Sequence, residues 1–196
     1  MCELRPRPDE AAAIVQLAVQ QLSLPPSGVA GRRFARLYQH VDDACWLLYV
    51  AEWESREAFA AYRRTATAPG RPEQFALPPV CRIYQRLALF ERVLVPSQLA
   101  RAEIVDGPAD THDERRERIV AYHRASVRDR THVAMLSIHE TTDTPAGLLI
   151  LSGWNGVDPK LLLDHDEDAD LVQQLTAADS IVQRFIGRQV IENLGA

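Results

Sequence analysis

The chain has 196 residues, 46% of them hydrophobic and 25% charged, which is typical of globular proteins that bury a core. A formal net charge of −5 without a cluster of lysines or arginines argues against a nucleic-acid partner, because basic arrays hold phosphate backbones. No apolar run approaches the roughly 20 residues that cross a bilayer, and no signal peptide is evident, so we expect a cytoplasmic protein that does not enter membranes.

The first half begins with a short strand and a helix. The strand is expected around residues 2–5. Apolar residues recur at helical spacing over residues 8–22, with Asp9 and Glu10 near the N-terminal end, which predicts an amphipathic helix. The apolar stripe consists of Ala11, Ile14, Val15, Ala18 and Leu22.

A hairpin follows this helix. Residues 37–40 and the apolar run 46–53 predict two strands, joined by the polar turn Val41-Asp42-Asp43. Ser55 is a natural N-cap for a second helix over residues 57–62. A closing strand is expected near residues 80–93.

The second half repeats this order of elements. Its strands are expected around residues 102–105, 136–139, 147–154 and 181–191. Thr111 can cap a helix and form a capping box with Glu114, and Asp158 followed by Pro159 predicts the start of the next helix. Like the run 46–53, the run 147–154 ends in tryptophan, and a Leu-x-x-His sequence precedes both.

Each half therefore predicts strand, helix, hairpin, helix and strand, the βαββαβ order of a ferredoxin-like module. The fold class is α+β, with one module over residues 1–95 and a more divergent one over residues 96–196. Helices cover one face of each sheet and leave the other bare. Since a bare apolar face needs a cover, we expect two tandem ferredoxin-like modules packed sheet to sheet as an intramolecular dimeric α/β barrel.

Three cysteines, Cys2, Cys45 and Cys81, lie far apart in the sequence. Their odd number predicts reduced thiols in place of a disulfide framework. No Cys-x-x-Cys pair indicates a zinc site.

Three segments of the first module carry a family resemblance: Glu3-Leu4-Arg5-Pro6-Arg7-Pro8, Val41-Asp42-Asp43 and Glu52-Trp53-Glu54-Ser55-Arg56-Glu57-Ala58-Phe59. With these segments the first module resembles the antibiotic biosynthesis monooxygenase-like family of the dimeric α/β-barrel superfamily. The second module departs from this pattern at Gly153-Trp154-Asn155-Gly156. The family includes oxygenases that oxidise polyketide anthrones or quinols without metal or flavin, heme-degrading enzymes, and proteins without assigned catalysis.

In the cofactor-free oxygenases the tryptophan that ends the third strand lines a pocket, and Trp53 matches this position. Strand alternation places Tyr49 on the same face. An indole and a phenol could hold a flat phenolic substrate, stabilise its deprotonated form and let that anion react with O2. Both residues could equally be large core side chains.

His40 and His139 end their strands and are candidates for a general base, the alternative being strand-end histidines in contact with water. Trp53, Tyr49 and His40 are thus the expected catalytic residues. The residues expected to contact substrate are Trp154, His139, Phe59, Tyr62 and Arg86. Arg82 and Arg184 are further candidates to bind an acidic or enolate oxygen.

Heme is the lower-ranked cofactor hypothesis, and otherwise no cofactor is expected. The heme-degrading relatives use an asparagine in the first strand and a histidine about ten residues beyond the tryptophan. The first module has neither. His165 lies eleven residues after Trp154, but the acidic run 164–168 around it would repel heme propionates. That run could also bind a divalent cation or be a solvated loop.

The sequence thus predicts a cofactor-independent monooxygenase that acts on a phenolic or quinol small molecule of polyketide type in specialised metabolism. The alternative is a non-oxidative polyketide cyclase or a small-molecule-binding protein on the same fold. A third possibility is that one module keeps the pocket while the other completes the barrel. The expected partner is an aromatic small molecule, and the expected assembly is a monomeric pseudo-dimer or a homodimer.

Overall fold

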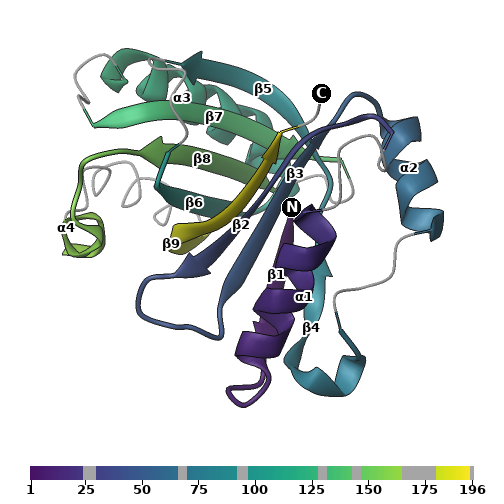
Figure 1. The fold of residues 1–196 in the computed structure, drawn as a ribbon. Helices are drawn as coiled ribbons and strands as arrows, with labels where there is room; N and C mark the ends of the chain where they lie inside the picture. The colour runs from purple at the N-terminus through teal and green to yellow at the C-terminus, as the bar shows by residue number, and fades with distance from the viewer. Residues whose placement is uncertain are drawn as a thin grey trace. The chain divides into compact units, whose positions relative to one another are not determined.

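The computed structural model describes residues 1–23, 30–65, 70–91, 97–127, 132–142, 147–164 and 180–194. The chain forms two compact units (Figure 1): unit 1 comprises Met1–Cys81 and Gly187–Ala196, and unit 2 comprises Arg82–Ile186. These boundaries differ from the expected division at residues 95 and 96. In the described part of the chain, none of the helices has the length and apolar character needed to cross a membrane.

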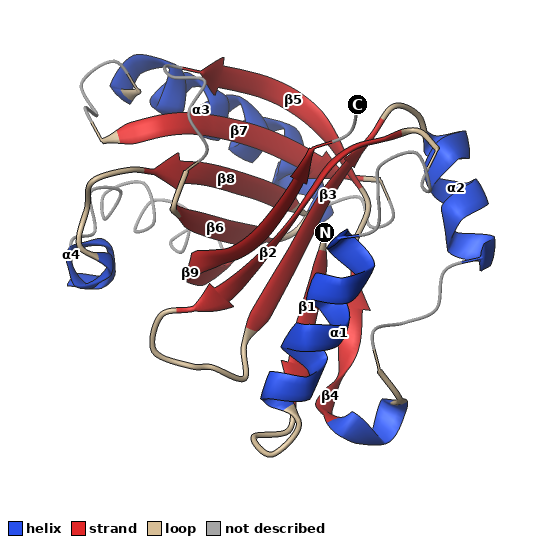
Figure 2. Ribbon diagram, in the orientation of Figure 1, coloured by secondary structure: helices blue, strands red, loops and turns tan. Residues whose placement is uncertain are grey.

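Unit 1 is an antiparallel sheet with two α-helices (Figure 2). Its elements are β1 (Cys2–Pro6), α1 (Ala11–Ser23), β2 (Arg32–His40), β3 (Leu47–Trp53), α2 (Arg56–Thr65), the 3-10 turn Pro72–Gln74 and β4 (Phe75–Cys81). The strands are ordered β4-β1-β3-β2. This is the order that a βαββαβ chain adopts in a ferredoxin-like fold, so the α+β class is confirmed.

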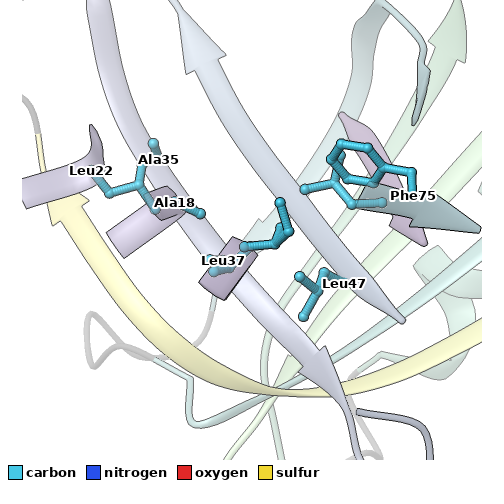
Figure 3. Packing of buried hydrophobic residues seen from close by; sticks show 8 residues of the cluster. Ala18, Leu22, Ala35, Leu37, Leu47 and Phe75 are labelled. Carbon is cyan, nitrogen blue, oxygen red and sulfur yellow. The ribbon is translucent and has the colours of Figure 1, made fainter. Parts of the chain in front are cut away.

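The core of unit 1 lies between α1 and the sheet (Figure 3). Ile14, Ala18 and Leu22 repeat every four residues and are at most 4% exposed, as the stripe in the sequence predicts. They pack with a cluster of strand residues: Leu4, Ala35, Leu37, Leu47 and Phe75. Tyr49 and Ala51 of β3 pack against the edge of this cluster, so the core fixes the strand face on which the candidate site lies.

Unit 2 has the same kind of sheet. Its elements are β5 (Tyr84–Glu91), β6 (Leu99–Asp106), the 3-10 turn Ala109–Thr111, α3 (His112–Ser126), β7 (Val133–Thr141), β8 (Leu148–Trp154), α4 (Pro159–Asp164) and the start of β9 (Ile181–Leu194). The strands are ordered β9-β6-β8-β7-β5. All seven residues of β8 are buried, as expected for a central strand.

The closing strands differ from the prediction. The single strand expected near residues 80–93 is two strands: β4 pairs with β1 in unit 1, and β5 pairs with β7 in unit 2. The strand expected at residues 181–191 extends to Leu194, and its final part pairs with β2 in unit 1. The apolar pattern of a strand indicates that it pairs, but it does not identify a partner far away in the sequence.

The expectation of reduced cysteines is wrong for two of the three. Cys2 and Cys81 form a disulfide and stand directly opposite each other in the register of β1 and β4, while Cys45 is free. The two cysteines are 79 residues apart in sequence. Counting cysteines could not show that the sheet brings this pair together.

Two of the three predicted helix caps are formed. The Ala58 amide donates to the Ser55 hydroxyl at 3.1 Å, and the Lys160 amide donates to Asp158 at 2.9 Å. The capping box at Thr111 is absent because the Thr111 hydroxyl instead donates to the Pro108 carbonyl. Glu114 pairs with Arg118 one turn further along α3.

Candidate functional site

The candidate site lies on the helix-facing side of β3. The register pairs Leu37 with Tyr49 and Arg32 with Trp53 across β2 and β3. Since cross-strand partners share a face, Arg32, Tyr49 and Trp53 point to the same side of the sheet. The expected alternation of Tyr49 and Trp53 on one face is therefore formed.

Helix α2 adds two aromatic rings to this face. The cap at Ser55 starts α2 just after β3, and Phe59 and Tyr62 lie three residues apart on one side of it. The Trp53 ring lies 4.8 Å from the Tyr62 ring and 5.6 Å from the Phe59 ring, both in tilted geometries. We call Tyr49, Trp53, Phe59 and Tyr62 the aromatic cluster; all four side chains are only partly exposed.

The Tyr49 phenol is held in its neutral form. Burial raises its pKa, the nearby Tyr62 raises it further, and a charge and hydrogen bond from Arg32 oppose these effects in part. The net direction is upward. Tyr49 is therefore a hydrogen-bond donor at neutral pH and not a base.

Arg32 completes the group and was missed by the sequence analysis. It is only 6% exposed although it is the first residue of β2. Its guanidinium donates to the Tyr49 hydroxyl, yet its Nη2 atom is buried without a hydrogen-bond partner. The only signal in the sequence is the Arg32-Arg33 pair, which does not show which arginine turns inward.

Gly31 allows α2 to lie close to this site. Its φ of +79° is in the left-handed region, and a Cβ there would approach the Ala58 Cβ to 2.5 Å. The Gly31 carbonyl also accepts a hydrogen bond of 2.8 Å from the Glu54 amide. Any larger residue would push α2 away from the first residues of β2.

His40 does not join the aromatic cluster. It ends β2 eight residues after Arg32, about 26 Å along an extended strand, and stacks on Trp46 with ring centroids 4.7 Å apart. Trp46 belongs to the face opposite Tyr49, and Arg5 covers its ring at 3.7 Å. Burial lowers the pKa of His40, in part against the nearby Asp42 and Asp43. A base at His40 would therefore act on the face of the sheet opposite Tyr49.

At the described strand positions of unit 2, the residues that correspond to Arg32 and Tyr49 are of a different kind. The strand registers correspond position by position, so Val133 pairs with Trp154 where Arg32 pairs with Trp53, and Ile150 stands where Tyr49 does. Trp154 is 3% exposed and donates its indole N–H to Ser152 at 2.8 Å. Its surroundings are those of a core residue.

The strand registers also show that His40 and His139 do not occupy equivalent positions in the two units, contrary to the expectation from the sequence. His139 pairs with Leu149 where Tyr38 pairs with Leu48, so it corresponds to Tyr38. Burial, and then the charge of Arg86 opposite it in the β5 and β7 register, lower the pKa of His139 to about 4. Arg82 and Arg184 are engaged in ion pairs with Asp106 and Glu103. Neither arginine is available for a ligand in the way the sequence suggested.

The depressed pKa of His139 predicts an acid-sensitive stability. The unfolded chain takes up this proton near pH 6.5 and the folded chain only near pH 4, so stability is lost as pH falls between these values. Acidification from pH 6.5 to 4.5 should cost the wild type about 2 kcal/mol of unfolding free energy through this group. In His139→Gln that part of the loss should vanish. Urea unfolding at both pH values measures it, and equal acid sensitivity in both proteins would contradict the assignment.

Unit 2 also has a shallow groove between β5 and α3. It has a volume of about 260 Å³. Its lining residues are Leu87, Arg116, Glu117, Val120, Ala121 and Arg124. It contains none of the expected site residues, and the aromatic cluster remains the better candidate because it combines flat rings with a buried charge.

Comparisons with solved structures agree with the sequence-based resemblance. An anthrone oxidase-like protein matches with a TM-score of 0.74 at 12% identity, covering all of this chain and 92% of its own. A Listeria monocytogenes ferredoxin-fold protein related to antibiotic biosynthesis monooxygenases matches with a TM-score of 0.52 at 12% identity, covering 96% and 94%. This chain shares the fold of the antibiotic biosynthesis monooxygenase-like proteins. A proposed monooxygenase of Fusobacterium nucleatum also matches, with a TM-score of 0.74 at 9% identity over 98% and 92% of the chains.

At these identities the likeness establishes the monooxygenase-like fold and not the chemistry. No protein-family model and no curated protein matches the sequence. The function therefore has to be argued from the site.

The residues of unit 1 do not fit heme. Strand β1 has no asparagine and α2 has no histidine, the two residues that the family resemblance implies for heme binding. His165 and residues 165–168 of the acidic run lie outside the described residues. Within the described ranges, no three His, Cys, Asp or Glu side chains are grouped to hold a metal ion.

Proposed function

We propose that the chain is a cofactor-independent monooxygenase that binds a planar phenol, anthrone or quinol against the aromatic cluster and oxidises it with O2. The observation that carries this proposal is the placement of the Trp53 and Tyr62 rings 4.8 Å apart, next to a neutral Tyr49 phenol and the buried Arg32. Aromatic rings bind flat apolar substrates, and the two polar groups favour an ionised oxygen on them.

The chemistry needs the substrate as an anion. An anthrone loses a proton from its CH2 group, and the resulting carbanion adds O2 to give a peroxide anion. Uptake of one proton gives the hydroperoxide, and loss of water leaves the quinone carbonyl, so CH2 and O2 become C=O and H2O. The protein's part is to stabilise the first anion by the hydrogen bonds and charge at Tyr49 and Arg32.

A second candidate is binding or cyclisation without oxidation. Tyr49, Trp53, Phe59, Tyr62 and Arg32 include no carboxylate or imidazole, and His40 lies on the opposite face. A site without an internal base suits a protein that binds a ligand that is already ionised. In the oxygenase proposal the proton passes to water.

The test is oxygen consumption by purified, chelator-treated protein with a panel of anthrones and hydroquinones. The oxygenase proposal expects one O2 consumed per quinone formed, with one atom of labelled O2 in the new carbonyl. Ligands that bind and are released unchanged, or that cyclise without oxygen uptake, would replace this proposal with the second candidate.

Further elements of the proposal follow from the sequence. The substrate is a polyketide-type molecule of specialised metabolism, and the protein acts in the cytoplasm as a monomeric pseudo-dimer or a homodimer. The packing of two modules sheet to sheet as an intramolecular dimeric α/β barrel is also retained as part of this proposal. Light scattering at several protein concentrations measures the assembly.

A further inference from the structure

Arg32 holds a buried positive charge that no carboxylate of the described residues compensates. Arg32 is only 6% exposed, and its Nη2 atom is buried without a hydrogen-bond partner. Among the described residues no carboxylate forms a salt bridge with it. The neighbouring Arg33 behaves as a surface arginine, with a side chain 54% exposed that pairs with Glu52 at 3.2 Å.

An uncompensated buried guanidinium is costly, because the desolvation of the charge is not offset by an acceptor. Such a group persists where a ligand supplies the acceptor. The missing partner at Nη2 must be a hydrogen-bond acceptor, and the positive charge favours an anionic one.

The residues around Arg32 indicate what kind of ligand fits this site. Arg32 is the cross-strand partner of Trp53, and the Trp53 ring in turn contacts the rings of Phe59 and Tyr62. Because the Tyr49 oxygen accepts a hydrogen bond from Arg32, the Tyr49 proton is directed to another acceptor. Two donors, one of them charged, thus stand beside three aromatic rings.

Unit 2 shows that the fold does not require this arrangement. At the corresponding register positions it has Val133 and Ile150, and its tryptophan uses an internal partner, Ser152. A structural need for a buried arginine at the start of this strand would apply to both units.

We propose that Arg32 and Tyr49 form a two-donor site for an anionic oxygen of a planar aromatic ligand, with the Arg32 Nη2–H and the Tyr49 O–H as donors. The ligand class is a phenolate, enolate or aromatic carboxylate. This inference rests on the proposed function for where the ligand binds and not for its oxidation.

The test uses 2-hydroxyanthraquinone, a flat phenol that is already a quinone and whose ionised form absorbs at longer wavelength. Bound to the wild type, the probe should have a phenol pKa about one unit below that of the free probe, which corresponds to about tenfold tighter binding of the anion. Arg32→Met should remove the shift and weaken anion binding about tenfold, and Arg32→Lys should restore part of it. Arg33→Met is the matched control and should leave both unchanged.

Thermal unfolding separates a binding role from a structural one. Because Arg32→Met removes an uncompensated charge, its melting temperature should equal or exceed that of the wild type. A lower melting temperature, an unshifted probe pKa in the wild type, or equal binding by Arg32→Met would overturn the inference. If the probe pKa is shifted but no O2 is consumed, the two-donor site stands and the oxygenase proposal fails. If Arg32→Met consumes O2 as fast as the wild type, the oxygenase proposal stands and the two-donor site fails.

Discussion

Tyr49→Phe should lower kcat for anthrone oxidation about 100-fold, the size of effect seen when one preorganised donor to a developing oxyanion is removed. The KM should change little, because the ring that contacts the substrate is kept. Initial rates of oxygen uptake over a range of substrate concentrations measure both constants.

Tyr38→Phe is the matched control for this substitution. Tyr38 lies on β2, is 2% exposed and alternates with Leu37, so it points to the opposite face from Tyr49. The Tyr38→Phe variant also loses one phenol hydroxyl but should keep the wild-type kcat for anthrone oxidation. Equal losses from the two variants would mean that the hydroxyl acts through stability and not through the substrate.

Leu37→Ala should reduce the free energy of unfolding by about 3 to 4 kcal/mol, in the range for a fully buried leucine replaced by alanine. Leu37 is 0% exposed and lies in the cluster between α1 and the sheet, directly opposite Tyr49 in the register. The deleted atoms would leave a cavity behind the strand that carries the site. Urea unfolding followed by circular dichroism measures the change.

Leu77→Ala provides the comparison, because Leu77 of β4 is 60% exposed. This change should cost no more than about 0.5 kcal/mol. Comparable losses at both positions would contradict the assignment of the core to the α1 face.

Features encoded locally could be predicted from the sequence. The spacing of Ile14, Ala18 and Leu22 specifies both a helix and its buried face, and Ser55 specifies where α2 begins. The alternation along β3 placed Tyr49 and Trp53 on one side. Each of these depends on residues a few positions apart, where periodicity and capping chemistry are decisive.

Features that depend on distant pairing could not be predicted in this way. The Cys2–Cys81 disulfide depends on the pairing of β4 with β1. The segment predicted as one closing strand near residues 80–93 forms β4, which pairs with β1, and β5, which pairs with β7, and no local pattern identifies these partners. The histidine match failed because the Leu-x-x-His sequence recurs two positions too early: Leu37 and Leu136 are 99 residues apart, whereas equivalent positions in the two strand registers, such as Tyr49 and Ile150, are 101 residues apart. Arg32 was missed because an arginine at a strand start is usually exposed.

The central claim is that the aromatic cluster of unit 1, and not the corresponding region of unit 2, holds the substrate. It is tested most directly by oxygen uptake with one anthrone substrate in Trp53→Phe and Trp154→Phe, both first shown by circular dichroism to be folded. The account predicts that Trp53→Phe loses most of its kcat/KM while Trp154→Phe retains it. Equal losses in the two variants, or a Trp53→Phe rate equal to that of the wild type, would contradict it.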